Sequence, residues 1–284
     1  MIAPEAPVRT THFPQPLVPE PPPVSAASAT RYRISACIGQ HIGDRGEQQD
    51  RAGLFTSKRS AGCVLAIVAD GMGGRTGGSL AAEQVIATAR ALFEEFNPST
   101  QSVTDLLAEI IRDAHTIIQL TAVTAEKEPH STIVAMVLQP GVANWAHVGD
   151  SRLYFFKGEQ LEFRTTDHSY VEHLIRSGKL AREASAGHKM GHVLTSALGT
   201  DRPPVVDFGE ARDLSPNDSF LLCSDGLWHY FTDQELGQAI AYSPTRKASE
   251  ALIENARYRA RGKGDNCTFG LVKLMDPGSE TVIG

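Results

Sequence analysis

The chain has 284 residues, of which 41% are hydrophobic and 21% are charged, and its formal net charge at pH 7 is −6. These values are ordinary for a globular protein, and the negative charge with no basic run excludes a typical nucleic-acid binder. No apolar stretch is long enough to cross a bilayer, and the N-terminus lacks the basic and apolar segments of a signal peptide. We therefore expect a cytoplasmic protein without a membrane partner.

The two ends of the chain differ in composition from the rest. Residues 1–30 hold eight of the sixteen prolines and few large apolar side chains, so we expect a disordered, Pro-rich tail. A ligand for a proline-binding domain is the alternative for this segment. We expect one folded domain over 31–275 and a polar C-terminal tail over 276–284. The four cysteines are far apart and form no C-x-x-C pair, which indicates reduced thiols.

The first half of the folded region predicts three strands and then two helices. In chain order these cover 32–38, 52–56, 63–69, 79–96 and a helix that begins with the capping box Ser102-x-x-Asp105.

The second half is richer in strands. Four short apolar runs predict an antiparallel meander over 133–138, 142–148, 153–156 and 160–164. A polar segment over 169–192 predicts an insertion on the surface. Two strands over 205–208 and 219–223 then follow. A helix capped by Thr232 and Glu235 comes next, and after it a helix from Pro244 to Gly262. The last strand covers 267–274. This order predicts an α+β fold, with antiparallel sheets and helices on the outside.

Five aspartates stand at predicted element boundaries beside glycine or small polar residues: Asp50, Asp70, Asp150, Asp225 and Asp265. One such junction is usually a turn, but five of them without a cluster of histidine or cysteine indicate an all-oxygen metal site. Mg²⁺ and Mn²⁺ prefer such ligands. Several converging carboxylates favour more than one ion, and two ions ~3.5–4 Å apart can activate water for in-line attack on a phosphoryl group.

Other machinery for phosphoryl transfer or hydrolysis is missing from the sequence. No cysteine has an arginine six positions later, and there is no Asp-x-Asp, G-x-x-x-x-G-K, G-x-S-x-G or H-E-x-x-H motif. Water activated by metal is the option that remains.

Eight motifs, in order and spacing, resemble the protein phosphatase 2C family of metal-dependent serine/threonine phosphatases. They are Arg45-x-x-Gln48-Gln49-Asp50, Asp70-Gly71-Met72-Gly73-Gly74, Ser131-Thr132, Gly149-Asp150-Ser151-Arg152, Thr166-Asp167-His168-Ser169, Leu194-x-x-Ala197-Leu198-Gly199, Cys223-Ser224-Asp225-Gly226-Leu227 and Gly264-Asp265-Asn266. The resemblance covers about residues 31–275. It implies a four-layer α/β/β/α sandwich with a site for two Mn²⁺ or Mg²⁺ ions at one end.

The resemblance also implies a role for each site residue. Asp70 would bridge the two metals, the Gly71 carbonyl would coordinate one, and Asp225 and Asp265 would hold the other. Asp50 would orient water at the edge of the site. Asp150 matches the residue that binds a third, weaker ion in bacterial members, and Arg45 would bind the substrate phosphate. Residues 169–192 would form a flap beside the site, containing His188 and His192.

Some positions depart from the family pattern. Gln48 stands where asparagine is usual, so the local loop geometry could differ. Met72 replaces a histidine of eukaryotic members near the leaving group, which leaves the general acid unassigned between water and His168. Ser196 stands where bacterial relatives often carry arginine. None of these departures removes a predicted metal ligand.

The predicted function is hydrolysis of phosphoserine and phosphothreonine in proteins by metal-activated water, without a covalent intermediate. The implied partners are phosphorylated proteins and an opposing serine/threonine kinase, and we expect a monomer. Two alternatives stay open: a catalytically dead relative that acts as a binding module, and a phosphoesterase for small molecules. The presence of Asp70, Asp225 and Asp265 argues against the first, whereas the second would use the same metal chemistry.

Overall fold

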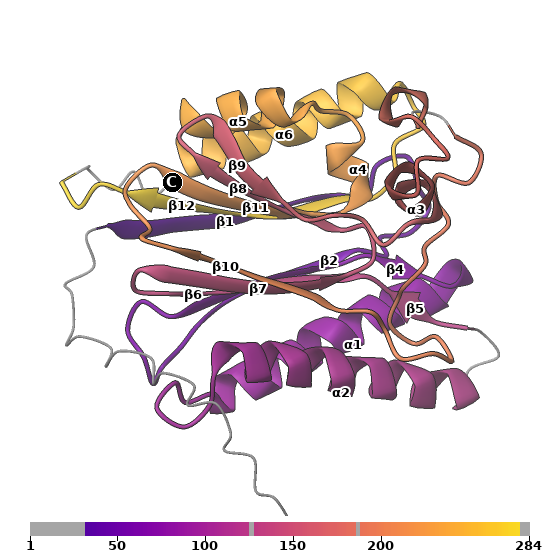
Figure 1. Cartoon of the computed structure of the whole chain (residues 1–284), viewed down its shortest axis with the longest axis horizontal. Helices are drawn as coiled ribbons and strands as arrows, with labels where there is room; N and C mark the ends of the chain where they lie inside the picture. Colours follow the sequence, from indigo (N-terminus) through magenta and orange to yellow (C-terminus); the bar gives the residue numbers. More distant parts are fainter. Residues whose placement is uncertain (1–31, 125–127, 186–187, 279–284) are drawn as a thin grey trace, which may run out of the picture.

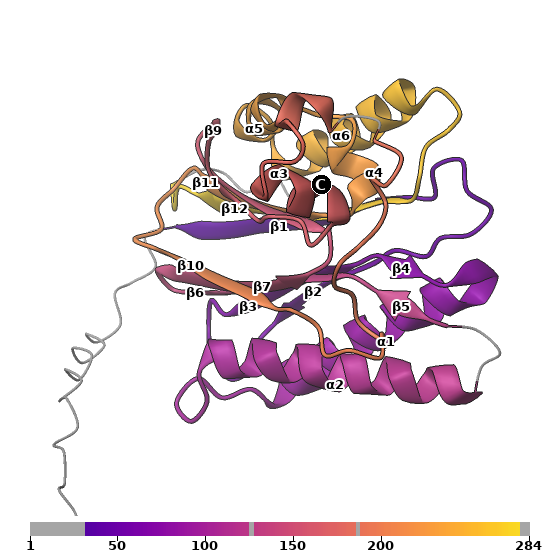
Figure 2. The same ribbon diagram turned by 45° about the vertical axis from the view of Figure 1, so that its right-hand side comes forward.

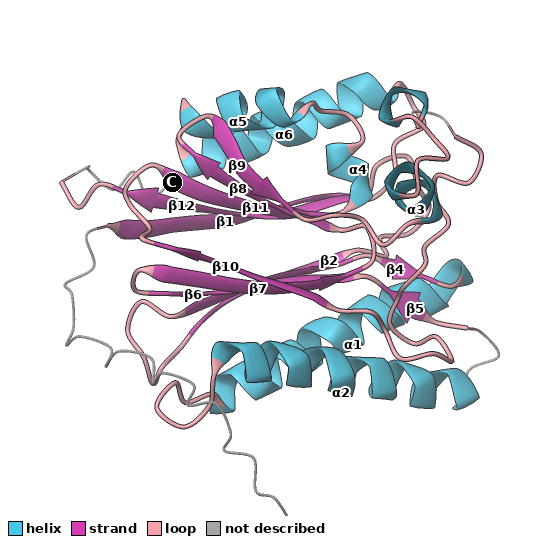
Figure 3. Cartoon of the chain, viewed as in Figure 1, coloured by secondary structure: helices cyan, strands magenta, loops and turns pink. Residues whose placement is uncertain are grey.

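Two five-stranded antiparallel sheets face each other in the computed structural model, and helices cover both outer faces (Figure 1). Figure 3 shows the strands as two inner layers and the helices as two outer layers. The α+β sandwich predicted from the sequence is therefore confirmed. The structure describes residues 32–124, 128–185 and 188–278, so the predicted tail over 1–30 and most of the tail over 276–284 lie outside the described residues.

Each sheet combines strands from distant parts of the chain. The first sheet has the order β1 (Arg33–His41), β12 (Cys267–Met275), β11 (Asp218–Cys223), β8 (Arg152–Lys157) and β9 (Gln160–Arg164). The second has the order β10 (Asp207–Arg212), β7 (Val142–Val148), β6 (Ile133–Gln139), β3 (Val64–Ala69) and β2 (Arg51–Thr56). A separate two-stranded ladder pairs β4 (Gly71–Met72) with β5 (His130–Ser131).

The helices agree in part with the prediction, and a short helix at Asp225–Trp228 lies where none was predicted. They are α1 (Gly74–Glu95), α2 (Val103–Thr124), α3 (Tyr170–Arg176), a 3-10 turn (Arg182–Ala184), α4 (Asp225–Trp228), α5 (Asp233–Ala241) and α6 (Thr245–Ala260). Thr232 and Glu235 form the predicted capping box at the start of α5. Among the described residues, no helix has the length and apolarity needed to cross a membrane.

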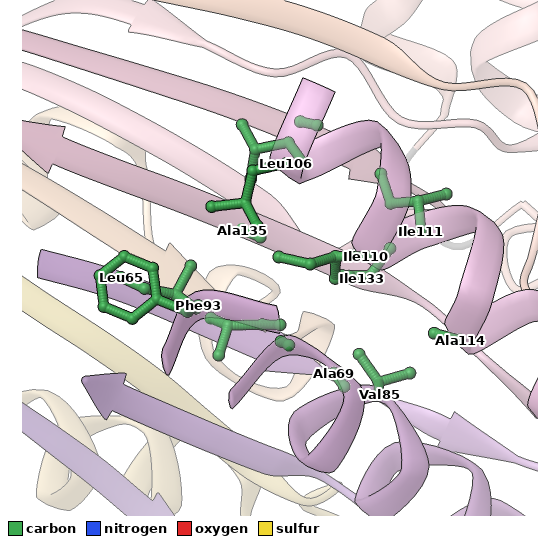
Figure 4. Packing of buried hydrophobic residues seen from close by; sticks show 14 of the residues in the cluster. Leu65, Ala69, Val85, Phe93, Leu106, Ile110, Ile111, Ala114, Ile133 and Ala135 are labelled. Atoms are coloured by element: carbon green, nitrogen blue, oxygen red, sulfur yellow. The ribbon is translucent and has the colours of Figure 1, made fainter. Parts of the chain in front are cut away.

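The hydrophobic core has three layers because each sheet is covered on both faces. Alternate residues of β3 point in opposite directions: Leu65 and Ile67 pack toward α1 and α2, whereas Ala66 and Val68 pack between the sheets. Figure 4 shows the first of these layers, in which Phe93 of α1 and Ile110 of α2 lie beside strand residues such as Leu65. The third layer fills the space between the first sheet and helices α4, α5 and α6.

The predicted meander over 133–164 is wrong at its centre. β6 pairs with β7 and β8 pairs with β9, but β7 and β8 belong to different sheets. The chain crosses between the sheets at residues 149–151 (Figure 2), where Gly149 has a φ of 103°. Apolar alternation is the same in a hairpin and in a crossing, so the pattern does not separate the two. The crossing places Asp150 at the junction of both sheets.

Helix α1 begins five residues before the predicted start at Ser79. The pair Gly77-Gly78 predicts a loop because glycine disfavours helix interiors. In the structure the backbones of Gly71 and Gly78 approach closely, and a Cβ on Gly78 would lie 2.5 Å from the Gly71 carbonyl oxygen. Close backbone packing thus explains a glycine that local propensity alone places outside the helix.

A comparably close contact joins α4 to the segment before β12. A Cβ on Gly226 would lie 2.0 Å from the carbonyl oxygen of Asn266. This contact holds the start of α4, which carries Asp225, against the turn that carries Asp265. Gly270 in β12 is the natural comparison, because nothing lies within 4 Å of its Cβ position.

We expect Gly226→Ala to lower the free energy of unfolding by about 1–3 kcal/mol, because backbone must move to admit the methyl group. Urea denaturation followed by circular dichroism measures this loss. Gly270→Ala makes the same chemical change with free space and should leave stability nearly unchanged. Equal stability of the two variants would show that the contact at Gly226 does not constrain α4.

Candidate metal centre

The five predicted aspartates all lie at ends of strands where the two sheets meet. Asp70 follows β3, Asp225 follows β11 as the first residue of α4, and Asp150 lies in the crossing from β7 to β8. Asp50 directly precedes β2, and Asp265 lies two residues before β12. β4 and α4, which continue from β3 and β11, lie at the same end of the sandwich in Figures 1 and 2. The fold therefore gathers residues that are far apart in the chain, with 215 positions between Asp50 and Asp265.

The charges of the other four aspartates all raise the pKa of Asp70, which indicates that these carboxylates lie close together. Desolvation by the surrounding protein raises the pKa of Asp70 well above its usual value, and the charges of Asp50, Asp225, Asp150 and Asp265 raise it further. Asp70 therefore lies where the fields of the other four meet.

The same two causes act on other members of the group. Burial, together with neighbouring aspartates, raises the pKa of Asp50 to about 8 and that of Asp150 to about 8. Desolvation and then the charge of Asp265 raise the pKa of Asp225. The protein thus holds several carboxyl groups where their ionised forms need a compensating positive charge.

The described residues supply little of that charge themselves. Of the five aspartates, Asp265 alone forms an ion pair with a described residue, and its partner is Arg45. No three of the carboxylates have oxygens all within 4.8 Å of one another, so they are not packed as tightly as the ligands of a single small ion. Mg²⁺ and Mn²⁺ suit these widely spaced carboxylates because these hard ions prefer oxygen ligands, and Mg²⁺ in particular keeps several waters. The donor set therefore fits divalent ions of this class.

The backbone around Asp70 is fixed by hydrogen bonds from the neighbouring chain. Thr132 donates its N–H to the Asp70 carbonyl at 2.8 Å, and the Asp70 N–H donates to Thr132 Oγ1 at 3.0 Å. Ser131 Oγ also donates to the Asp70 carbonyl, at 3.1 Å. Gly71 follows directly, and a side chain at Gly78 would collide with its carbonyl oxygen. The glycine at position 78 thus allows a close approach to the Gly71 backbone that a side chain would prevent.

Asp50 is the most buried aspartate of the group, with 1% of its surface exposed. Ser224 Oγ donates to its carboxylate at 2.7 Å and accepts a hydrogen bond from the Thr268 N–H at 3.2 Å. Gln40 Nε2 donates to the Asp50 carbonyl at 3.0 Å. Since Ser224 directly follows β11, Thr268 lies in β12 and Asp50 leads into the second sheet, these contacts tie the two sheets together at the centre.

The loop that carries Arg45 is organised by the side chain of Asn266. Asn266 Nδ2 donates to the carbonyls of Ile42 and Glu47, and its Oδ1 accepts from the Gln49 N–H at 2.7 Å. Asn266 is 5% exposed, so these bonds form in a desolvated setting. Arg45 itself is 61% exposed and pairs with Asp265 at the rim of the centre.

The side chains of Trp228 and Arg152 hold the backbone at Asp150. Trp228 Nε1 donates to the Asp150 carbonyl at 3.0 Å, and the guanidinium of Arg152 lies 3.4 Å from the centroid of the Trp228 ring. Arg152 also forms two hydrogen bonds of 2.7 Å with the carboxylate of Asp167. The motifs around Asp150 and Asp167 therefore form one buried network that fixes the crossing between the sheets.

Two histidines lie near Asp225, and sequence reasoning missed one of them. The charges of His229 and His192 both act on Asp225 to lower its pKa, against the larger effect of desolvation. The two rings stack with centroids 6.3 Å apart. His192 was predicted in the flap. His229 carried no signal, because it follows Asp225 by four residues at the end of a helix of only four residues.

His168 lies in a cluster with His147 and Asp207. Its ring stacks on His147 with centroids 4.6 Å apart, and its Nε2 lies 3.2 Å from a carboxylate oxygen of Asp207. These contacts direct the ring toward His147 and Asp207, and the role of His168 as proton donor to the leaving group stays a prediction.

The departures at Gln48 and Ser196 have local structural roles. Gln48 Oε1 accepts from the Asp50 N–H at 3.1 Å, so the longer side chain still closes the turn. Ser196 is 8% exposed and its Oγ accepts from the Val205 N–H at 2.8 Å, which fastens the segment that leads into β10. Ser196 therefore acts on the backbone and not on a ligand.

Comparisons with known proteins identify the family. A family model described as protein phosphatase 2C matches residues 39–257. A protein phosphatase 2C-type protein of Streptococcus pyogenes is 30% identical over 248 residues, which cover 85% of this chain and 96% of the relative.

Two solved structures show the same fold. The serine/threonine phosphatase of Streptococcus agalactiae is 27% identical, has a TM-score of 0.78, and is matched over 85% of this chain and 100% of its own. The catalytic domain of the phosphatase PstP in complex with two manganese ions is 26% identical, has a TM-score of 0.70, and is matched over 86% of this chain and 99% of its own.

The chain belongs to the protein phosphatase 2C family. It is a bacterial-type member of these metal-dependent serine/threonine phosphatases, and its enzyme class is that of the phosphoprotein phosphatases.

With metal removed by a chelator, we expect the melting temperature to fall as pH rises. An unfolded aspartate has a pKa of ~3.9. In the folded protein Asp50 and Asp150 titrate near 8, so between these values the folded state binds more protons and loses stability as the pH increases. Added Mn²⁺ should restore the melting temperature at the upper end of this range.

Asp50→Asn is the control for this measurement, because it removes one charge and keeps the side-chain shape. In chelator at pH 8 its melting temperature should exceed that of the wild type, with each kcal/mol shifting the midpoint by about 2–4 °C. A wild type whose stability in chelator does not decrease between about pH 4 and pH 8 would contradict strong repulsion in the centre.

Proposed function

We propose that this chain hydrolyses phosphoserine and phosphothreonine in proteins at the aspartate centre, without a covalent enzyme intermediate. The observation that carries the proposal is the convergence of five carboxylates with an exposed arginine at their rim. When bound, divalent cations supply Lewis acidity toward phosphate oxygens and an activated water as the nucleophile. The residues of this chain supply position, orientation and substrate recognition.

Each carboxylate has a role that fits its place. Asp70, where the fields of the other four meet, would bridge two ions, and the Gly71 carbonyl would be a ligand of one of them. Asp225 and Asp265 would hold the other ion. Asp50, held by Ser224, would orient water rather than bind directly, because its carboxylate already accepts a hydrogen bond.

Asp150 would hold a third and weaker ion. It lies in the crossing between the sheets, and its electrostatic neighbours include Asp225 and Asp167. Arg152 partly offsets these charges, since its guanidinium lowers the pKa of Asp150. A carboxylate with a nearby cation binds a further metal ion less tightly, which supports the weaker site. The ligand set suits both Mn²⁺ and Mg²⁺, since both ions prefer oxygen ligands.

Arg45 would bind the phosphate of the substrate. Its guanidinium stays charged at any working pH, and its planar fork matches two phosphate oxygens. The side chain is largely exposed and pairs with Asp265, so it can exchange one anionic partner for another at the rim. Asn266 holds the loop in place while the arginine side chain moves.

Residues 169–192 would shape substrate choice as a flap. Within its described part, α3 is joined to the flap's later segment by an ion pair between Glu172 and Arg182, with a shortest distance of 2.9 Å. Ser169 and Leu194 form an isolated bridge that anchors the base of this segment. His192 at its end reaches His229 beside the centre. The flap thus borders the surface where a phosphoprotein would have to approach.

The physiological setting belongs to the same proposal. The substrates would be phosphorylated by one or more serine/threonine kinases, and the enzyme would oppose them as a cytoplasmic monomer. A binding module without activity is the less favoured function, because the complete set of aspartates is present. A phosphoesterase for small molecules would share the metal chemistry and differs in what the flap admits.

Release of phosphate from a phosphothreonine peptide should depend on Mn²⁺ and should be lost in Asp225→Asn. The amide keeps the shape of the side chain but removes the charge that attracts the ion. We expect a decrease of at least about 100-fold in kcat/KM, equal to about 2.7 kcal/mol of transition-state stabilisation. Activity without metal, or full activity of the variant, would contradict the mechanism. Efficient hydrolysis of small phosphate esters with none of the phosphopeptide would favour the alternative substrate class.

Arg45→Ala should raise KM for the phosphopeptide more than it lowers kcat, because the side chain contacts the ground-state phosphate. Loss of hydrogen bonds to a charged group costs about 1.5–3 kcal/mol, or roughly 10–150-fold in KM. Arg212→Ala is a matched control, since Arg212 is also exposed and paired with a carboxylate, that of Glu210. Identical kinetics for the two variants would exclude Arg45 from phosphate binding.

A further inference from the structure

A second group of possible metal ligands lies in a cluster that the phosphatase mechanism does not use. His147 lies in β7, His168 lies between β9 and α3, and Asp207 is the first residue of β10. Each presents one ligand atom, and these three atoms all lie within 4.8 Å of one another. Within the described ranges, no other three histidine, cysteine or acidic residues meet this spacing.

His147 is prepared as a ligand by its surroundings. The side chain is 2% exposed, and its Nε2 lies 3.0 Å from the carbonyl oxygen of Thr166. A carbonyl can only accept, so Nε2 carries the proton and Nδ1 carries a lone pair. Burial also lowers the pKa of His147, which favours the neutral ring. Histidine ligands commonly donate their second N–H to a backbone carbonyl in this way.

The lone pair of His147 has no protein partner in the part of the chain that the structure describes. Nδ1 of His147 and Nε2 of His168 are buried, and neither makes a hydrogen bond of good geometry. Buried polar atoms without partners are uncommon because they lose their bonds to water. If the cluster were only a His168–Asp207 ion pair, Nδ1 of His147 would still lack a partner.

The spacing of His168 and Asp207 fits a small metal ion. Nε2 of His168 lies 3.2 Å from Oδ2 of Asp207. Ligand atoms around a tetrahedral zinc ion with bonds of ~2.0–2.1 Å lie ~3.3 Å apart. Asp207 is 51% exposed, so its carboxylate can adjust and solvent can supply a fourth ligand.

Proton balance sets the condition for binding. The Gly149 N–H donates to Nδ1 of His168 at 3.3 Å, so the neutral ring of the free protein carries its proton on Nε2. An ion at Nε2 takes the place of that proton and Nδ1 becomes protonated, so the ring stays neutral and the long hydrogen bond from the Gly149 N–H is given up. The His168 N–H keeps its bond of 2.9 Å to the Gly149 carbonyl, so the loop stays anchored.

We propose that His147, His168 and Asp207 form a separate site for one divalent transition-metal ion of the zinc class. Imidazole ligands suit Zn²⁺, Co²⁺ and related ions, whereas the aspartate centre offers oxygen alone. The two sites therefore select different metals within one domain. They are connected through Gly149, which contacts His168 and directly precedes Asp150.

Binding of Co²⁺ and Zn²⁺ to the full-length protein tests this site. Co²⁺ with histidine ligands in a tetrahedral site has a strong visible absorption, which an octahedral oxygen site lacks. We expect this absorption in the wild type and in Asp225→Asn, whose change affects the aspartate centre alone. Asp207→Asn should lose it and should bind Zn²⁺ at least tenfold more weakly in calorimetry. The half-exposed position of Asp207 makes this substitution compatible with folding.

Asp213→Asn provides a matched control, because Asp213 is an exposed aspartate just after β10 and its replacement changes the charge equally. This variant should bind both ions like the wild type. Absence of the tetrahedral Co²⁺ spectrum in the wild type would overturn the proposal and would indicate that water fills the cluster. Equal zinc affinity of Asp207→Asn and Asp213→Asn would also overturn it. Neither result bears on phosphatase activity, which depends on the other centre.

Discussion

Mutual repulsion among five carboxylates is the constraint on which the rest of this structure depends. Asp70 is desolvated and feels the charge of four neighbours, so the ionised group is costly unless cations are present. A loose fold would relieve the repulsion by moving the side chains apart. The sandwich prevents this because each aspartate lies at the end of a strand or helix whose other residues are buried in one of three apolar layers. Packing energy therefore keeps the ligands in place for the ions.

The supporting contacts show how two sheets are made into one site. Ser224 connects Asp50 to β12, Asn266 holds the loop of Arg45, and Trp228 fixes the carbonyl of Asp150. None of these three residues has to touch a metal or a substrate. Each places one aspartate or the arginine relative to the opposite sheet, so their loss should affect metal binding through position. The close backbone contact at Gly226 serves the same purpose without a side chain.

Much of the site could be predicted because its chemistry leaves local marks. An apolar strand that ends at Asp70 and a glycine, or at Ser224 and Asp225, shows where a buried strand presents a carboxylate at its end. The capping box at Thr232 is equally local, and the structure confirms it. The crossing at Gly149 could not be predicted, because alternation does not tell a hairpin from a change of sheet. His229 and the role of Asn266 depend on contacts between distant segments, which no local pattern reveals. The same holds for the cluster of His147, His168 and Asp207.

The central proposal is that Asp70 would bridge two ions, and electron paramagnetic resonance of the Mn²⁺-loaded protein tests it most directly. Two ions that share a carboxylate bridge are magnetically coupled, so the wild type with two equivalents of Mn²⁺ should give the broad spectrum of a coupled pair. Asp70→Asn should give either no bound Mn²⁺ or the signal of isolated ions, while its circular dichroism stays that of the folded protein. A wild type that binds two Mn²⁺ ions as isolated centres, or an Asp70→Asn variant with an unchanged coupled spectrum, would contradict the account.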